Sequence, residues 1–185
     1  MENTFYQEST NSGGITFDLT FMGLHGAKAP DVHIVGSGSL TLIGGAKQLN
    51  TNGDLYIEAP INFNANGDYF CDAVNANNVI VCEDVKLNFN VNGTLLYAKG
   101  GIDIKSGAVI KAKTTAPFVM NDYTNKNGFL CTNDVNITNA SVEIELAADP
   151  ARFTSFYNGI ANFIGINNRG KLSLKESTVK ITQTA

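Results

Sequence analysis

Tryptophan is absent from this 185-residue chain, and cysteine (3), proline (4) and charged residues (16%) are scarce. Globular chains usually carry about 25% charged residues; here asparagine, glycine, threonine and serine replace them, which disfavours long helices. No apolar run approaches the roughly 20 residues that a membrane-spanning helix needs. The 13 basic and 17 acidic side chains leave a net charge of -4, which opposes electrostatic capture of nucleic acid. Evenly spread Val, Ile, Leu and Phe exclude a disordered chain.

The three cysteines have an odd count and no metal-site spacing, so they form no disulfide framework. We expect Cys82 and Cys131 to be reduced and mostly buried, because other repeats carry aliphatic or small residues at their positions. Residues 2–14 contain neither the basic nor the apolar segment of a secretory signal. The chain is therefore either cytoplasmic or lacks its signal, and the asparagine-rich, lysine-poor composition favours an extracellular or cell-surface location.

The chain repeats itself. Residues 61–67 read INFNANG, and residues 87–93 read LNFNVNG, 26 positions later. A second pattern, apolar-x-small or polar, three residues, then apolar-x-apolar, fits residues 49–57, 74–82, 96–104, 129–137 and 166–174. Apolar residues alternate with period two in every repeat, which predicts strands with one buried face. Gly, Asn, Asp and Pro separate two short strands in each repeat, as turns require.

Repeats of this length, built from short strands, are typical of coils in a parallel β-helix, where each coil buries its apolar face on its neighbours. We predict an all-β fold, a single-stranded right-handed parallel β-helix with about 22–25 residues per coil. The strands predict eight inward-pointing side chains in stacked columns: Leu55, Ile57, Ile102, Ile104, Val135, Ile137, Leu172 and Leu174.

Outward positions of the second strand in each repeat supply independent support, because they were not used to find the repeat. Stacked coils would place them in two columns, reading Asn62-Asn88-Lys111-Glu143-Lys180 and Asn64-Asn90-Lys113-Glu145-Thr182. Asn beside Asn and Lys beside Glu are the neighbours that in-register parallel strands favour. Antiparallel strands would have no reason to produce this order.

The chain is predicted to be one β-helix domain over residues 1–185, with an N-terminal lead-in at 1–14. Two repeats are longer than the rest, which predicts loop insertions at about 113–128 and 147–167. Loops on a rigid scaffold often carry binding residues, and these loops contain several aromatic side chains. The alternative, which we favour, is that they fold back over a coil or over the end of the stack, where exposed strand edges need cover.

Catalytic chemistry finds little support in the sequence. His25 and His33 lie far from the cysteines and from most acids, so no nucleophile–base arrangement is evident. Asp68 and Asp72 with Asn66 offer hard oxygen ligands from one turn, which suits calcium. The alternative is that these side chains cap turn amides. No basic residue stands beside the two carboxylates to act as the base of a lyase.

Tyrosine and asparagine side chains are the candidate sugar ligands, through ring stacking and amide hydrogen bonds. A structural asparagine ladder with no ligand is the alternative reading for the asparagines. The candidate ligand-binding residues are Tyr56, Tyr69, Asn64, Asn90 and Tyr123.

Residues 36–42 (GSGSLTL), 49–57 (LNTNGDLYI) and 165–174 (GINNRGKLSL) resemble repeats of a bacterial family, the secreted carbohydrate-binding domain proteins with a pectate-lyase-like β-helix. The resemblance implies a right-handed parallel β-helix on the cell surface that binds acidic polysaccharide without catalysis. It also implies calcium at acidic turns, and the turn with Asp68 and Asp72 lies where that family tends to place one.

We therefore expect a non-catalytic carbohydrate-binding or adhesion module of a bacterial secreted or surface protein. Calcium is the expected cofactor, and a polysaccharide, acidic in nature, is the expected partner; nucleic acid and a membrane span are not expected. One alternative is a polysaccharide-active lyase or hydrolase, or a fragment of one, on the same scaffold. Another is a structural spacer that carries other domains of a larger parent protein.

Overall fold

The computed structural model describes residues 5–8, 17–18, 29–43, 47–65, 72–91, 93–116, 126–148 and 163–184. All regular structure in these ranges is β-strand, arranged in three sheets whose neighbouring strands are all parallel. The all-β prediction is confirmed. No helix in this part of the chain has the length and apolarity needed to cross a membrane.

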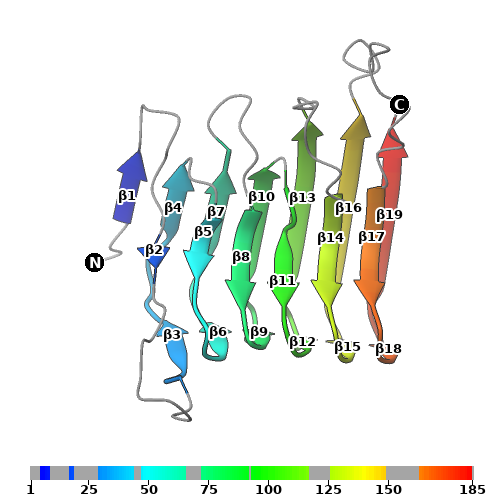
Figure 1. The fold of residues 1–185 in the computed structure, drawn as a ribbon, viewed down its shortest axis with the longest axis horizontal. Helices are drawn as coiled ribbons and strands as arrows, with labels where there is room; N and C mark the ends of the chain where they lie inside the picture. The colour runs from blue at the N-terminus through cyan, green and yellow to red at the C-terminus, as the bar shows by residue number, and fades with distance from the viewer. Residues whose placement is uncertain are drawn as a thin grey trace.

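The strands form one sheet of seven strands and two sheets of six, named here sheets A, B and C (Figure 1). Sheet A is ordered β1 (Phe5–Glu8), β4 (Leu40–Ile43), β7 (Ile61–Asn64), β10 (Lys86–Val91), β13 (Val109–Ala116), β16 (Ser141–Ala148) and β19 (Thr178–Thr184). Sheet B is ordered β2 (Phe17–Asp18), β5 (Lys47–Asn50), β8 (Asp72–Ala76), β11 (Leu96–Ala98), β14 (Lys126–Cys131) and β17 (Phe163–Asn168). Sheet C is ordered β3 (Val32–Ile34), β6 (Leu55–Ile57), β9 (Val79–Val81), β12 (Ile102–Ile104), β15 (Val135–Thr138) and β18 (Leu172–Lys175).

The chain visits sheets A, B and C in turn and then begins the next coil, so strands with the same place in successive coils pair with each other. This is the predicted parallel β-helix, and it winds right-handed from the N-terminal to the C-terminal end (Figure 1), as parallel crossovers nearly always do. Each coil holds three strands rather than the predicted two. The third strand, in sheet B, is the first half of the repeat pattern found in the sequence.

Sheet A has the predicted register. Asn88 pairs with Asn62 and with Lys111, and the column continues through Glu143 to Lys180. The second column runs in the same way from Asn64 through Asn90 to Thr182. The Asn88 amide donates to Asn62 Oδ1 at 2.9 Å, so the predicted asparagine ladder is hydrogen-bonded.

One repeat differs from its predicted alignment by one residue. The sequence pattern matches Cys82 with Ile57 and Ile104, but the structure pairs Val81 with both of them. Val81 is fully buried, whereas Cys82 is half-buried after the end of β9. The pattern drifts here because Val79, Ile80 and Val81 are all apolar, which conceals the alternation that fixes the register.

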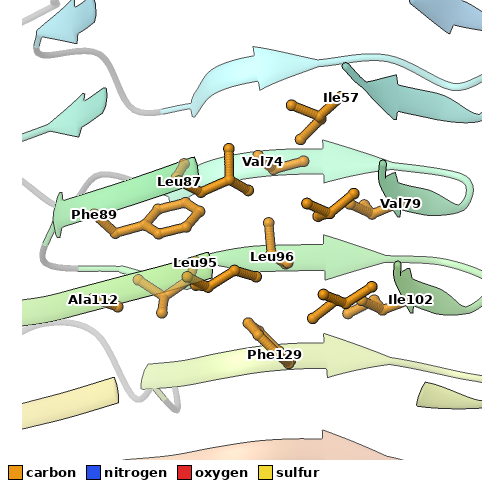
Figure 2. Packing of buried hydrophobic residues seen from close by; sticks show 14 of the residues in the cluster. Ile57, Val74, Val79, Leu87, Phe89, Leu95, Leu96, Ile102, Ala112 and Phe129 are labelled. Carbon is orange, nitrogen blue, oxygen red and sulfur yellow. The ribbon is translucent and has the colours of Figure 1, made fainter. Parts of the chain in front are cut away.

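Inward side chains of all three sheets form one continuous core. Figure 2 shows residues of successive coils, among them Leu87, Leu96 and Phe129, filling the space between the sheets. Phe63 and Phe89 stack in one column, with ring centroids 4.6 Å apart. Among the eight predicted inward residues, those of β6, β12 and β15 are 0–1% exposed, which confirms their orientation.

Leu172 and Leu174 on β18 stack in the same columns as Val135 and Ile137 but are 43% and 52% exposed. They lie on the last strand of sheet C, where no further strand of the described residues pairs with them. Their expected burial is therefore wrong, because a stacked position is closed only when another coil covers it.

Cys82 and Cys131 are free thiols, as expected. Cys131 is buried, with its Sγ donating to the carbonyl oxygen of Asn133 at 3.3 Å, whereas Cys82 is half-buried. Burial raises the pKa of both thiols, because a thiolate loses hydration inside the protein. Cys71 lies outside the described residues.

Two aspartate substitutions in one column of sheet C should lower the free energy of unfolding by very different amounts. Ile104→Asp puts a carboxylate into the closed core and should lower the free energy of unfolding by at least about 3 kcal/mol. Leu174→Asp, at the exposed end of the same column, should cost less than about 1 kcal/mol. Chemical denaturation of dilute protein measures both, and equal losses would contradict the assigned core.

The buried thiol of Cys131 should be protected from reagents. In a variant with Cys71 and Cys82 replaced by serine, a bulky thiol reagent at pH 7 should modify Cys131 at least about 100-fold more slowly than in denaturant, because reaction requires local opening. The matched variant that keeps only Cys82 should react faster. Modification of native Cys131 at the unfolded rate would contradict its burial.

Candidate functional site

An open groove of about 700 Å³ lies on the outer face of sheet C. Its floor is a column of outward residues from successive coils, and its wall is the turn that precedes each sheet C strand. The floor contains Tyr56, Ile80, Asp103 and Asn136, and the wall contains Asp54, Asn78, Gly101, Asn133, Asp134, Arg169 and Gly170. The groove therefore runs along the solenoid axis and crosses several coils.

Hydrogen bonds between coils fix the first part of the wall. Asp54 Oδ1 accepts from the side-chain amides of Asn77 (2.6 Å) and Asn78 (2.8 Å) in the next coil. Asn78 Oδ1 in turn accepts from the backbone N–H of Gly101 at 2.7 Å. A Cβ at Gly100 would lie 2.1 Å from the same oxygen, so this close approach requires glycine. The wall is a rigid polar ladder.

Asp134 and Arg169 stand at the C-terminal part of the groove. Asp134 Oδ1 accepts from the backbone N–H of Lys171 at 2.8 Å, and a Cβ at Gly170 would lie 2.3 Å from that oxygen. Arg169 is exposed, and no ion pair to it is found within the described ranges. Its guanidinium is thus available to a ligand.

Tyr56 stands at the opposite end of the groove. Its ring stacks on the His33 ring of the preceding coil, with centroids 4.4 Å apart and planes inclined by 2°. His33 is held by Glu58, whose Oε1 lies 2.6 Å from His33 Nδ1. Tyr56 lines the groove and His33 does not, so the stacked pair marks the N-terminal end of the groove.

The groove carries a net negative charge, because its lining contains three aspartates, Asp54, Asp103 and Asp134, and one arginine, Arg169. Asp103 forms an ion pair with Lys105 two residues further along the chain, which offsets part of that charge. Asn136 is the next residue after Asp103 in the same column of sheet C. The lining therefore offers hydrogen-bond acceptors and amide groups beside one aromatic face and one cation.

The structure separates the predicted sugar-binding residues. Tyr56 lines the groove, but Asn64 and Asn90 are paired neighbours in sheet A, on another face of the solenoid. The backbone carbonyl oxygens of both asparagines accept intramolecular hydrogen bonds, from Gln48 Nε2 at 2.6 Å and from the Ala65 N–H at 2.8 Å. The two asparagines therefore cannot share a site with Tyr56. Tyr69 and Tyr123 lie outside the described residues.

The predicted calcium ligands are only partly visible. Asp72 lies in β8, where its Oδ1 accepts from the backbone N–H of Thr94 at 2.6 Å, and Asn66 and Asp68 lie outside the described residues. This bond gives Asp72 the turn-capping role that was the alternative to metal binding. Across the ranges that the structure describes, no three His, Cys, Asp or Glu residues cluster as a metal site. Calcium binding at this turn stays a prediction.

The sequence analysis found only Tyr56 among the groove residues and missed the rest, including Asp103, Asp134, Asn136 and Arg169. The signal was present, since Asp103 and Asn136 are the central residues of the same apolar-x-apolar strands that place Tyr56 outward. The outward column of the first strand in each repeat would have aligned them with Tyr56, as the column of the second strand aligned the residues of sheet A. The wall residues carry no such signal, because Asn and Asp are common in any turn.

A smaller hollow of about 340 Å³ lies on sheet A around the charged columns. Lys180 Nζ donates to Glu143 Oε1 at 2.9 Å, and Lys113 Nζ lies 3.5 Å from Glu145 Oε1. These charges pair with one another across coils, so they hold the sheet in register and offer less to a ligand than the groove does.

Comparison of the chain with protein-family models, with curated proteins and with solved structures finds no match. The resemblance to secreted carbohydrate-binding proteins therefore stays a prediction, and functional inference depends on the groove itself.

The ion pair across sheet A predicts a titration shift. The hydrogen bond and positive charge of Lys180 lower the pKa of the Glu143 carboxyl below its usual 4.5. Any stability from this pair is present above that ordinary pKa and is lost as pH falls through the lowered value. Carboxyl NMR titration should show a higher pKa for Glu143 in Lys180→Gln. An unchanged value would contradict the pairing.

Proposed function

We propose that the chain is a non-catalytic carbohydrate-binding module of a secreted or surface protein, and that the sheet C groove is its glycan site. The observation that carries this proposal is the groove itself, which runs along the axis across several coils. An extended polymer can lie in such a groove and meet one set of side chains per coil, at steps of about 4.8 Å.

The lining suits sugar chemistry. Tyr56, half-buried at one end of the groove, offers an aromatic surface against which a pyranose ring can pack. Asp103 and Asp134 can accept hydrogen bonds from sugar hydroxyls, and the Asn136 amide can both donate and accept. Arg169 at the other end adds a donor for a ring oxygen, a hydroxyl or a carboxylate.

The charge of the groove favours a neutral glycan. Three aspartates face one arginine, and the whole chain carries a net charge of -4, so an acidic polymer would be repelled. An acidic polysaccharide would need a bridging cation, for which calcium is suited. A chelator such as EDTA therefore distinguishes the two ligand classes. It should leave binding of a neutral glycan intact and abolish calcium-bridged binding of an acidic one.

The hydrogen bonds and ion pair made by the groove carboxylates support binding without catalysis. Asp54 accepts hydrogen bonds from side-chain amides, Asp134 accepts one from a turn N–H, and Asp103 pairs with Lys105. Carboxylates held in this way position the wall, and they are poorly placed to exchange protons with a substrate.

Tyr56→Ala tests the site, with Tyr97→Ala as its matched control. Both tyrosines are the half-buried central residues of three-residue strands, β6 and β11, but Tyr97 lies on sheet B, away from the groove. On the glycan that binds best in an array, Tyr56→Ala should raise Kd about tenfold. Tyr97→Ala should leave Kd unchanged.

The array is run with and without EDTA, and the bound glycan is assayed for cleavage or unsaturated products. Binding that survives EDTA and yields no product is the expected result. Equal loss of affinity in both tyrosine variants, or no binding to any glycan, would contradict the groove as the site. Formation of product would contradict non-catalytic binding and would indicate an enzyme that acts on the glycan.

A further inference from the structure

The C-terminal end of the solenoid exposes side chains that the rest of the fold buries. Strands β17, β18 and β19 are the last of their sheets, and no described strand pairs with their outer edges. Leu172, Leu174 and Ile181 are 43%, 52% and 42% exposed. Their partners one coil earlier, Val135, Ile137 and Ile144, are all 0% exposed. Figure 1 shows this end on the right.

The N-terminal end presents the same three sheets in the same order through β1, β2 and β3. Because each sheet is a set of continuous columns, the first and last residues of a column are defined by the pairing register. If the next coil were the first coil of another copy, most inward columns would continue from an apolar residue to an apolar residue. The apolar pairs created would be Leu172 with Val32, Leu174 with Ile34, Ile166 with Phe17, and Val179 with Phe5, whereas Ile181 would meet Gln7.

The two ends also carry opposite charge. The last described coil, residues 163–184, contains four basic residues and one acidic residue. The described residues up to residue 34, which include the three first strands, contain three acidic residues (Glu8, Asp18 and Asp31) and no lysine or arginine. In the continued register Lys171 would meet Asp31, one position before the pair of Leu172 with Val32. Opposite charges in facing positions favour that approach.

We propose that copies of this chain associate head to tail, with the C-terminal coil of one copy stacked on the first coil of the next. The edge strands of the two copies extend sheets A, B and C by parallel hydrogen bonding, and the exposed leucines become buried. Because the two joined surfaces differ, each copy keeps one free end of each kind. The contact does not close on itself, so it produces filaments rather than a dimer.

Sedimentation of the 185-residue chain over a range of concentrations tests the proposal. The weight-average mass should rise with concentration beyond two copies and fall as salt is added, since salt screens the charged ends. Leu172→Glu with Leu174→Glu buries two carboxylates in the contact and should raise the dissociation constant by about 100-fold or more. Both leucines are already exposed, so the circular dichroism and melting of the monomer should stay unchanged.

A charge swap identifies the partner surface. Lys171→Glu alone and Asp31→Lys alone should each weaken association about fivefold, because like charges meet. An equimolar mixture of the two variants should recover it, since the new glutamate of one variant then meets the new lysine of the other. Lys99→Glu, an exposed change of the same size in a central turn, should have no effect.

Three outcomes would overturn the proposal. The first is a wild-type chain that stays monomeric at low salt, as expected if residues 149–162 cover the C-terminal coil. The second is a weight-average mass that stops at two copies, together with no recovery of association in the mixture of the two charge variants. That result indicates that the C-terminal coils of two copies pair with each other. The third is association that the leucine variant leaves intact.

Discussion

In-register stacking of inward aliphatic columns is the constraint on which the structure depends. A three-residue strand such as β6 or β12 is too short to be stable alone, and each coil buries its apolar residues only because neighbouring coils lie above and below. Parallel register then places outward residues in columns as well. Any chemistry on the surface is therefore arranged along the axis, one residue per coil.

That geometry explains why the outer faces of sheets A and C differ. In sheet A the outward columns pair Asn with Asn and Lys with Glu, so the polar side chains satisfy each other. In sheet C the outward column changes from Tyr56 through Ile80 to Asp103 and Asn136, and the turn beside it forms a wall. Neighbouring side chains of unequal size leave a groove on that face.

The sequence was sufficient for the fold because alternation and column order are both visible in it. It predicted the sheet A register through Lys180 and Thr182, yet it misplaced Cys82 where the three apolar residues of β9 conceal the alternation. The exposure of Leu174 could not be predicted from its column, because burial at an end depends on whether another coil covers it. Of the groove, only Tyr56 was found; Arg169 and the wall come from turns, where residue type says little about direction.

The central claim is that one face of the solenoid, sheet C with its preceding turns, recognises a glycan. Backbone amide shifts of the labelled protein, followed by NMR as the best-binding glycan is titrated in, test it most directly. We predict changes in five clusters a coil apart, at residues 54–56, 78–80, 101–103, 133–136 and 169–170. Changes centred on the sheet A columns, or on residues 66–72 alone, would contradict the account.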